Sequence, residues 1–366
     1  MREERILTTE KRAAMSLRAL YRDYGYQPFR MSRFEEYDFY ARNKDFLVSD
    51  QIITFTDSRG KLMALKPDVT LSILKSGKDQ PGCRQKLCYS ENVFRVSSSS
   101  GQFREIMQAG LECIGDLDAY DSFEVVALAV KSLALLGKRS ILNLSHLGLL
   151  NALLDGLGGD GRLKAEVSRC IAGRSVHELR ALCRAAGCAE DQLRELCFFA
   201  DLYAPLADAP ALLAPCCESE SARAALAELK TLQAMLRDEG LDRSVMFDFS
   251  VVNNRKYYNG LVFQGFLEGV AESVLAGGQY DRLMERMGRK ASGLGFAVYL
   301  DRLEADRNEE EATDVDVLLL YSDAFKAAEK VRALRAAGKS VSAQRAVPEK
   351  LRWRDLIDLR GGESNA

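Results

Sequence analysis

Cysteine and histidine are the residue types best suited to metal or nucleophilic chemistry, and this chain holds nine cysteines and two histidines. A Cys-x-x-Cys pair, which is half of a usual zinc site, occurs nowhere in the sequence. The pairs Cys83/Cys88 and Cys183/Cys188 are spaced too widely for a zinc knuckle. Two histidines also give little scope for a Ser-His or Cys-His catalytic pair. We therefore predict no metal site and expect reduced thiols scattered over core and surface.

Helices and strands alternate over the first third of the chain, and they would position any functional residues there. Apolar residues recur at helical spacing in the first segment, with Leu17, Leu20 and Tyr21 on one stripe. Two β-hairpins follow, because alternating strand-like runs are separated by turn residues. The serine run between the second pair of strands is typical of a flexible hairpin loop. The predicted elements are a helix over 8–24, strands over 51–57 and 61–65, a short helix over 71–76, and strands over 86–96 and 103–115.

The remaining sequence changes from a helical block back to strands. Residues 148–242 are rich in Ala, Leu, Arg and Glu with helical periodicity, and glycines and Pro215 interrupt them. We interpret Gly277-Gly278 as a loop and residues 291–305 as a helix with closely packed small residues. The other predicted elements are a helix over 119–137, strands over 141–147, 245–250, 257–269 and 315–321, and a helix over 324–338.

This order of elements predicts an α+β fold, with an antiparallel sheet assembled from sequence-distant pieces and flanked by helices. We expect a core formed by residues 1–147 and 243–306, interrupted by a helical insertion over 148–242. Residues 307–366 would then form a short C-terminal βα segment.

Charge and hydropathy restrict the classes of partner. The formal net charge is -2, from 51 Lys+Arg and 53 Asp+Glu, which does not favour nucleic-acid binding. No apolar run approaches the ~18–20 residues that a membrane span needs. The charged start, MREERILTTEKRAAM, lacks the apolar core of a signal peptide. These features predict a cytoplasmic protein that binds neither nucleic acid nor membrane.

Five segments, in order, resemble the histidyl-tRNA synthetase family of class II synthetases over roughly residues 5–305. The resemblance implies the class II synthetase-like antiparallel sheet flanked by helices. GYQPFRMSRFEE resembles motif 1, the dimer-forming element, and ALKPDVT resembles the family's LRPEGT. NVFRV followed by GQFREIMQAGLECIG resembles motif 2, and NNRKYYNGLVFQGF resembles the histidine-specific RGLDYYTGTVFE. GGQYDRL and GLGFAVYLDRL resemble GGRYDGL and motif 3.

Only some of the positions at which this family has cationic residues for ATP are also cationic in this chain. Amino-acid activation brings a carboxylate against the α-phosphate of ATP, so the site needs cations near the developing negative charge. The resemblance implies that Arg95 and Arg302 keep two phosphate-binding positions. The third, the leading arginine of the histidine-specific motif, is Asn253 here. Losing such a group typically costs roughly 10²–10³ in rate. Lys256 replaces an aspartate of the family and reverses the local charge, so we expect ATP activation to be absent.

The family's histidine-reading positions are better kept. A substrate ammonium needs carboxylates, and an imidazole N–H needs a firm acceptor. Asp68 is one methylene shorter than the family's glutamate, and Val69 replaces its glycine. A structural role is the alternative, because acidic residues near strand ends often cap helices and paired tyrosines often pack. The resemblance implies histidine binding by Asp68, Thr70, Gln108, Glu112, Tyr257 and Tyr258.

Departures from the synthetase pattern indicate a regulatory paralogue. Roughly 55 residues follow the core, against about 90–100 for an anticodon-binding α/β domain of ordinary size. This shortening and Asn253 together resemble the ATP phosphoribosyltransferase regulatory subunits. That resemblance implies a non-catalytic homodimer without a cofactor. It would bind the short-form catalytic subunit and make the first step of histidine biosynthesis sensitive to histidine. A divergent histidine-activating enzyme and a tRNA-binding sensor on the same fold remain alternatives.

Overall fold

The computed structural model describes residues 8–47, 52–77, 79, 82–96, 100–137, 139–155, 161–251, 258–306 and 313–360. The chain forms two compact units, Met1–Ala305 and Asp306–Ala366, and each is described by itself. Within the described residues, no helix is long and apolar enough to cross a membrane.

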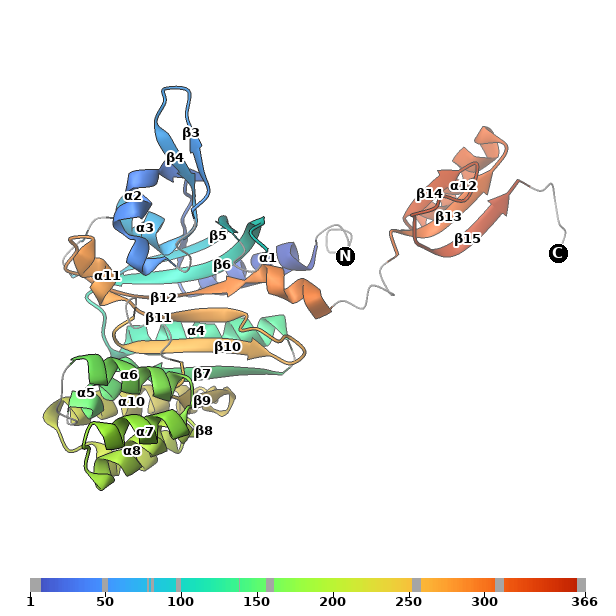
Figure 1. Ribbon diagram of the computed structural model, residues 1–366. Coiled ribbons are helices and arrows are strands. Elements are labelled where there is room, and N and C mark those ends of the chain that lie inside the picture. Colours follow the sequence, from blue (N-terminus) through green and yellow to red (C-terminus); the bar gives the residue numbers. More distant parts are fainter. Residues whose placement is uncertain are drawn as a thin grey trace. The chain divides into compact units, whose positions relative to one another are not determined.

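The first unit is built on a nine-stranded sheet (Figure 1). Neighbouring strands run antiparallel, except for the β1/β5 and β7/β9 pairs, which are parallel. Strands that are distant in sequence therefore lie side by side, which confirms the predicted α+β class. The order across the sheet is β1 (Gln27–Pro28), β5 (Gln85–Val96), β6 (Phe103–Gly115), β12 (Ser292–Tyr299), β11 (Leu275–Gln279), β10 (Leu261–Leu267), β7 (Ser140–His146), β9 (Val245–Asp248) and β8 (Tyr203–Pro205).

Two helices pack against the sheet and bury its apolar side chains. Helix α1 (Thr9–Asp23) contacts β5 and β6, and α4 (Ala119–Leu136) contacts β7, β10 and β12 (Figure 1). Thr8 caps α1, and Asp118 begins α4 with a reciprocal capping box. Tyr21 of α1 meets Phe296 of β12 edge-to-face, with ring centroids 5.9 Å apart. Both predicted helices are confirmed.

A smaller sheet stands beside the end of the large one. Its order is β2 (Phe34–Glu36), β4 (Leu62–Leu65) and β3 (Thr54–Thr56), and it confirms the first predicted hairpin. Helices α2 (Tyr37–Arg42) and α3 (Thr70–Ser76) lie next to this sheet (Figure 1). An aromatic and aliphatic cluster that includes Phe39, Leu71 and Tyr280 joins them to the large sheet.

Residues 148–242 are mainly helical, as predicted, and gather at the β7–β9–β8 end of the sheet (Figure 1). Their buried leucines belong to the same apolar core as the sheet, so packing against it holds the block in place. Strand β8 within this block was not predicted. The helices are α5 (Leu147–Asp155), α6 (Gly161–Ala172), α7 (Val176–Ala185), α8 (Glu190–Asp201), α9 (Ala209–Leu213) and α10 (Glu220–Asp238).

Two predictions near the C-terminal end of the core are wrong. Gly277 and Gly278 lie in strand β11 rather than in a loop, and residues 292–299 form strand β12 rather than a helix. Small residues mark close approaches between strands and side chains here. A Cβ at Gly277 would overlap the backbone of Gly295, and a Cβ at Gly293 would overlap the ring of Tyr280. The alternation of small and large residues in β12 therefore has the period of a strand.

The second unit contains the predicted strand, β13 (Val315–Tyr321), and the predicted helix, α12 (Ala324–Ala336). It also contains two strands that were not predicted, β14 (Val341–Gln344) and β15 (Trp353–Leu359). Both pair parallel with β13, in the order β14–β13–β15. The segment is therefore a small α/β unit with more strands than expected.

Candidate functional site

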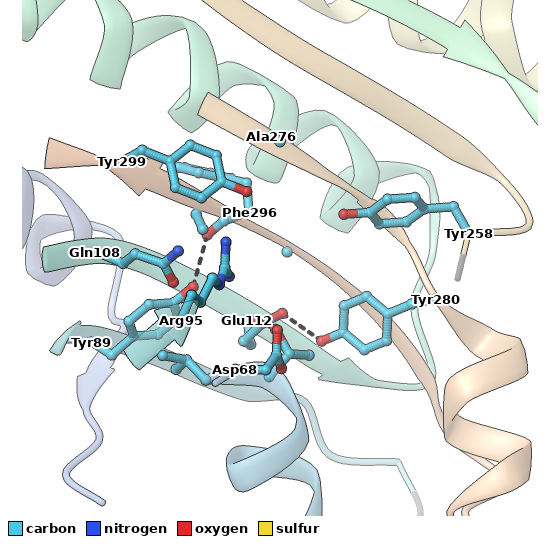
Figure 2. A pocket seen from close by; sticks show the side chains of 14 residues that line it. Asp68, Tyr89, Arg95, Gln108, Glu112, Tyr258, Ala276, Tyr280, Phe296 and Tyr299 are labelled. Atoms are coloured by element: carbon cyan, nitrogen blue, oxygen red, sulfur yellow. Dashed lines mark hydrogen bonds between the residues drawn. The ribbon is translucent and has the colours of Figure 1, made fainter. Parts of the chain in front are cut away.

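A pocket opens where the start of α3 faces strands β5, β6, β11 and β12 (Figure 2). The cavity has a volume of about 60 Å³, because side chains from these elements converge on one another. Six of the eight predicted site residues line it. The lining residues are Asp68, Val69, Thr70, Tyr89, Arg95, Gln108, Glu112, Tyr258, Ala276, Tyr280, Gly295, Phe296, Ala297 and Tyr299.

Glu112, on strand β6, lies at the floor of the pocket and is 1% exposed. The hydroxyl of Thr70 donates to its Oε1 at 2.6 Å, and the hydroxyl of Tyr280 donates to its Oε2 at 2.5 Å (Figure 2). Burial raises the pKa of Glu112 to about 8, although these two hydrogen bonds oppose the increase. The carboxyl is thus largely protonated at neutral pH until a cation or donor approaches it.

Asp68 lines the pocket and lies two residues before helix α3 begins. Its Oδ1 accepts from the backbone N–H of Leu71 at 2.8 Å, which is the structural role expected of an acidic residue at a helix start. Burial raises the pKa of Asp68, while the Leu71 hydrogen bond and the nearby Arg95 lower it. Arg95 in turn donates from Nε to the carbonyl of Pro67 at 3.2 Å. The hydrogen bond from Leu71 therefore accounts for one oxygen of Asp68, and the residue still lines the pocket.

Gln108 places a buried amide in the same pocket as Glu112. It precedes Glu112 by four residues on β6, so both side chains point to the same face of the strand. Gln108 is 3% exposed, and its Nε2 has no hydrogen-bond partner among the described residues. A buried amide without a partner is unfavourable by about 1–3 kcal/mol, so a ligand acceptor or a water molecule is expected there.

Of the remaining predicted site residues, one lines the pocket, one lies outside the described residues and one lies outside the pocket lining. Tyr258 lines the pocket, and burial raises its pKa well above the usual value. Tyr257, Asn253 and Lys256 lie outside the described residues. Arg302 is not among the lining residues; its guanidinium stacks on Tyr299, 4.4 Å from the ring centroid.

Arg302 is also held by protein groups. It donates to the carbonyl of Ser273 and forms an ion pair with Glu272 at 3.0 Å. These contacts are those of a structural ion pair, which is an alternative to a role in phosphate binding. Arg95, by contrast, is part of the pocket wall.

Eight of the lining residues were not among the predicted site residues, and four of these shape the pocket most directly. Tyr280 lies in GGQYDRL and Tyr299 in GLGFAVYLDRL, so both were within recognised motifs. Tyr89 donates to the carbonyl of Phe296 at 3.5 Å and closes another wall (Figure 2). Gly295 leaves the room that Glu112 occupies, since a Cβ there would overlap its carboxylate.

The pocket can recognise a small ligand that carries both a cation and hydrogen-bonding groups. Two carboxyls, an amide and several tyrosine hydroxyls face the cavity, with Arg95 as the lone cation among the described lining residues. The described residues include no group of three or more Cys, His, Asp or Glu placed to hold a metal ion. This chemistry suits an ammonium and an imidazole better than a polyanion.

Known proteins share both the sequence and the fold of this chain. The family profile described as histidyl-tRNA synthetase matches residues 4–303. An ATP phosphoribosyltransferase regulatory subunit from Oceanobacillus iheyensis is 26% identical over 332 residues, which cover 88% of this chain and 81% of the relative. Another protein of that name, from Syntrophotalea carbinolica, is 29% identical over 347 residues, covering 88% and 78%.

A solved structure agrees with these relatives. It is described as an ATP phosphoribosyltransferase regulatory subunit/histidyl-tRNA synthetase from Bacillus halodurans C, and its TM-score is 0.77 at 26% identity. The match covers 97% of this chain and 95% of that one. The family profile spans well over half of the sequence, and the fold agrees with it. The chain therefore belongs to the histidyl-tRNA synthetase family.

Proposed function

We propose that this protein is the non-catalytic regulatory subunit of an ATP phosphoribosyltransferase, required for the first step of histidine biosynthesis and for its feedback inhibition by histidine. The observation that carries the proposal is the pocket around Glu112, whose side chains are of the types that could bind histidine. The similarity of the chain to regulatory subunits of that name supports it.

Amino-acid activation is absent in this proposal. Asn253 carries no charge where the synthetase pattern has an arginine, and Lys256 stands where it has an aspartate. Arg302 also supports the proposal. Its guanidinium already interacts with Glu272 and Ser273 instead of being free to bind a phosphate of ATP. Removing one such transition-state group typically lowers the rate by roughly 10²–10³.

Histidine is the proposed effector. Its ammonium would lie near Asp68, and its imidazole near Glu112 and Tyr258, and the unpartnered amide of Gln108 offers a further donor in the same pocket. A cavity of about 60 Å³ is smaller than the ~150 Å³ that accommodates a benzene-sized ligand, so lining side chains would have to move to admit histidine. That requirement couples ligand binding to a change of conformation. Such coupling is typically worth about 1–3 kcal/mol between effector and active site.

Two protein partners belong to the proposal: a second copy of this chain and the short-form catalytic subunit. Phe34, in the segment that resembles the dimer-forming motif, is 50% exposed and contacts the partly exposed Phe55 edge-to-face at 5.4 Å. Exposed aromatic residues of this kind are frequent in subunit interfaces.

Calorimetric titration of histidine into the protein tests the effector site. Wild type should bind, and Glu112→Gln should bind about 10- to 100-fold more weakly, as expected when a charged hydrogen-bond partner is lost. Glu105→Gln is the matched control, because Glu105 is an exposed residue on the same strand. Unchanged binding in Glu112→Gln would place histidine elsewhere. Histidine-dependent pyrophosphate exchange or salt-dependent tRNA binding would instead support an activating enzyme or a tRNA-binding sensor.

A further inference from the structure

A second hollow lies where helices α2, α3 and α11 (Asp281–Arg286) end. It shares no lining residue with the pocket around Glu112. Its volume of about 710 Å³ falls within the range of roughly 300–1,000 Å³ that is usual for ligand pockets. Four basic side chains line it, and none of its described lining residues is acidic: Arg42, Lys75, Arg286 and Arg289.

Arg289 is the buried member of this basic set and is 8% exposed. Its Nε donates to Asp79 at 2.7 Å, and its Nη1 donates to the carbonyl of Leu74 at 3.5 Å. Its Nη2 has no hydrogen-bond partner within the described part of the chain. A Cβ at Gly77 would come within 2.9 Å of Nη1, so a glycine is needed to keep the guanidinium where it is. A buried cationic donor that lacks an acceptor indicates that an external acceptor completes the site.

Arg42 and Arg286 form no ion pair with any described residue. Arg42 donates from Nε to the carbonyl of Asp38 at 3.2 Å, and Arg286 donates from Nη2 to the carbonyl of Arg42 at 3.5 Å. The other two basic side chains are paired, Lys75 with Glu35 and Arg289 with Asp79. Among the described residues, therefore, these two exposed guanidinium groups of the hollow have no carboxylate partner.

Helix ends explain part of this arrangement but not all of it. Arg42, Lys75 and Arg286 each lie in the last turn of a helix, where a cation interacts favourably with the terminal carbonyls. Arg289 follows α11 instead of ending it, and it is buried. Its unpartnered donor is therefore the feature that points to a ligand.

We infer that this hollow binds a small polyanion bearing phosphate groups, held by Arg42 and Arg286 at its mouth and by Arg289 in its wall. The planar guanidinium groups can each present two parallel N–H donors to phosphate oxygens. Lys75 lines the hollow as well, but Glu35 already pairs with its charge. The inference does not depend on histidine binding at Glu112.

Titration of the full-length protein with inorganic pyrophosphate, followed by calorimetry, tests this inference. Wild type should bind more tightly than about 1 mM, and the double variant Arg42→Gln/Arg286→Gln should bind at least about tenfold more weakly. The matched control is Arg180→Gln/Arg184→Gln, which removes the same charge from exposed positions on α7 and should bind as wild type does.

Several results would overturn the inference. Absence of pyrophosphate binding to wild type would do so, as would equal weakening in both double variants, which would indicate a nonspecific charge effect. Loss of binding in Arg95→Gln, with the Arg42→Gln/Arg286→Gln variant unaffected, would place the anion in the pocket around Glu112. Equally tight binding of citrate, a polyanion without phosphate, would contradict the assignment to phosphate.

Discussion

Replacing Glu112 with glutamine should stabilise the free protein in a pH-dependent way. The substitution keeps the shape of the side chain and an oxygen for the Thr70 hydroxyl, and the Tyr280 hydroxyl can rotate to accept from the new amide. It removes a buried group whose ionisation the fold disfavours, since burial raises the pKa of Glu112 to about 8 from 4.5.

The sign and size of the effect follow from proton linkage. Below pH 4.5 the carboxyl is protonated in both the folded and the unfolded chain, so pH has no influence. Between pH 4.5 and about 8 the unfolded chain releases this proton and the folded chain keeps it, so wild-type stability falls as the pH rises. Each pH unit in this window contributes about 1.4 kcal/mol. Between pH 4.5 and pH 7 the advantage of the glutamine variant should therefore grow by about 3 kcal/mol.

Urea unfolding of both proteins at several pH values between 4.5 and 8.5 measures this difference. Asp79→Asn provides a control of opposite sign when the series is extended to pH values below 3.8, the ordinary pKa of this carboxyl. Burial raises the pKa of Asp79, but hydrogen bonds from Arg289 and two backbone N–H groups more than reverse this, so its pKa is lowered. Its carboxylate should contribute stability above its ordinary pKa and lose that contribution on acidification. A difference between Glu112→Gln and wild type that stays constant with pH would refute the reasoning.

Two further substitutions test the packing around this carboxyl. Tyr280→Phe removes the hydroxyl that bonds Glu112 at 2.5 Å, so the pKa of Glu112 should rise further and the window of falling stability should extend to higher pH; the same urea series detects it. Gly295→Ala would place a methyl group against the Glu112 carboxylate and the Leu111 carbonyl, which should destabilise the protein by roughly 1–3 kcal/mol; an unchanged unfolding midpoint would mean that β12 can shift to make room.

Much of the fold could be predicted where local patterns are strong. The β5–β6 hairpin has long alternating strands and was predicted almost to its bounds, at 86–96 and 103–115. Strands β11 and β12 were missed, because their glycines resemble turn or helix-packing residues when the opposing strand is unknown. Only the structure shows that Tyr280 and Glu112 fill the space that Gly293 and Gly295 leave.

The candidate-site residues that could be predicted from the sequence are those that lie in the recognised family motifs. Thr70 and Glu112 are distant in sequence, yet they meet through a 2.6 Å hydrogen bond. The order of the family motifs, rather than hydrophobic periodicity, indicated that the two residues belong to one site. The basic hollow had no such signal, because Arg42 and Arg286 lie on different helices and no local pattern links them. Strand β14 has only four residues and β15 alternates weakly, so the C-terminal unit was expected to be smaller than it is.

The most direct test of the proposed function is the ATP phosphoribosyltransferase activity of a cognate short-form catalytic subunit, measured with and without this protein across a histidine titration. The account predicts that the protein raises the activity and that histidine then inhibits it, with inhibition weakened in Glu112→Gln and retained in Glu105→Gln. A catalytic subunit whose rate and histidine response are the same with and without this protein would contradict the account.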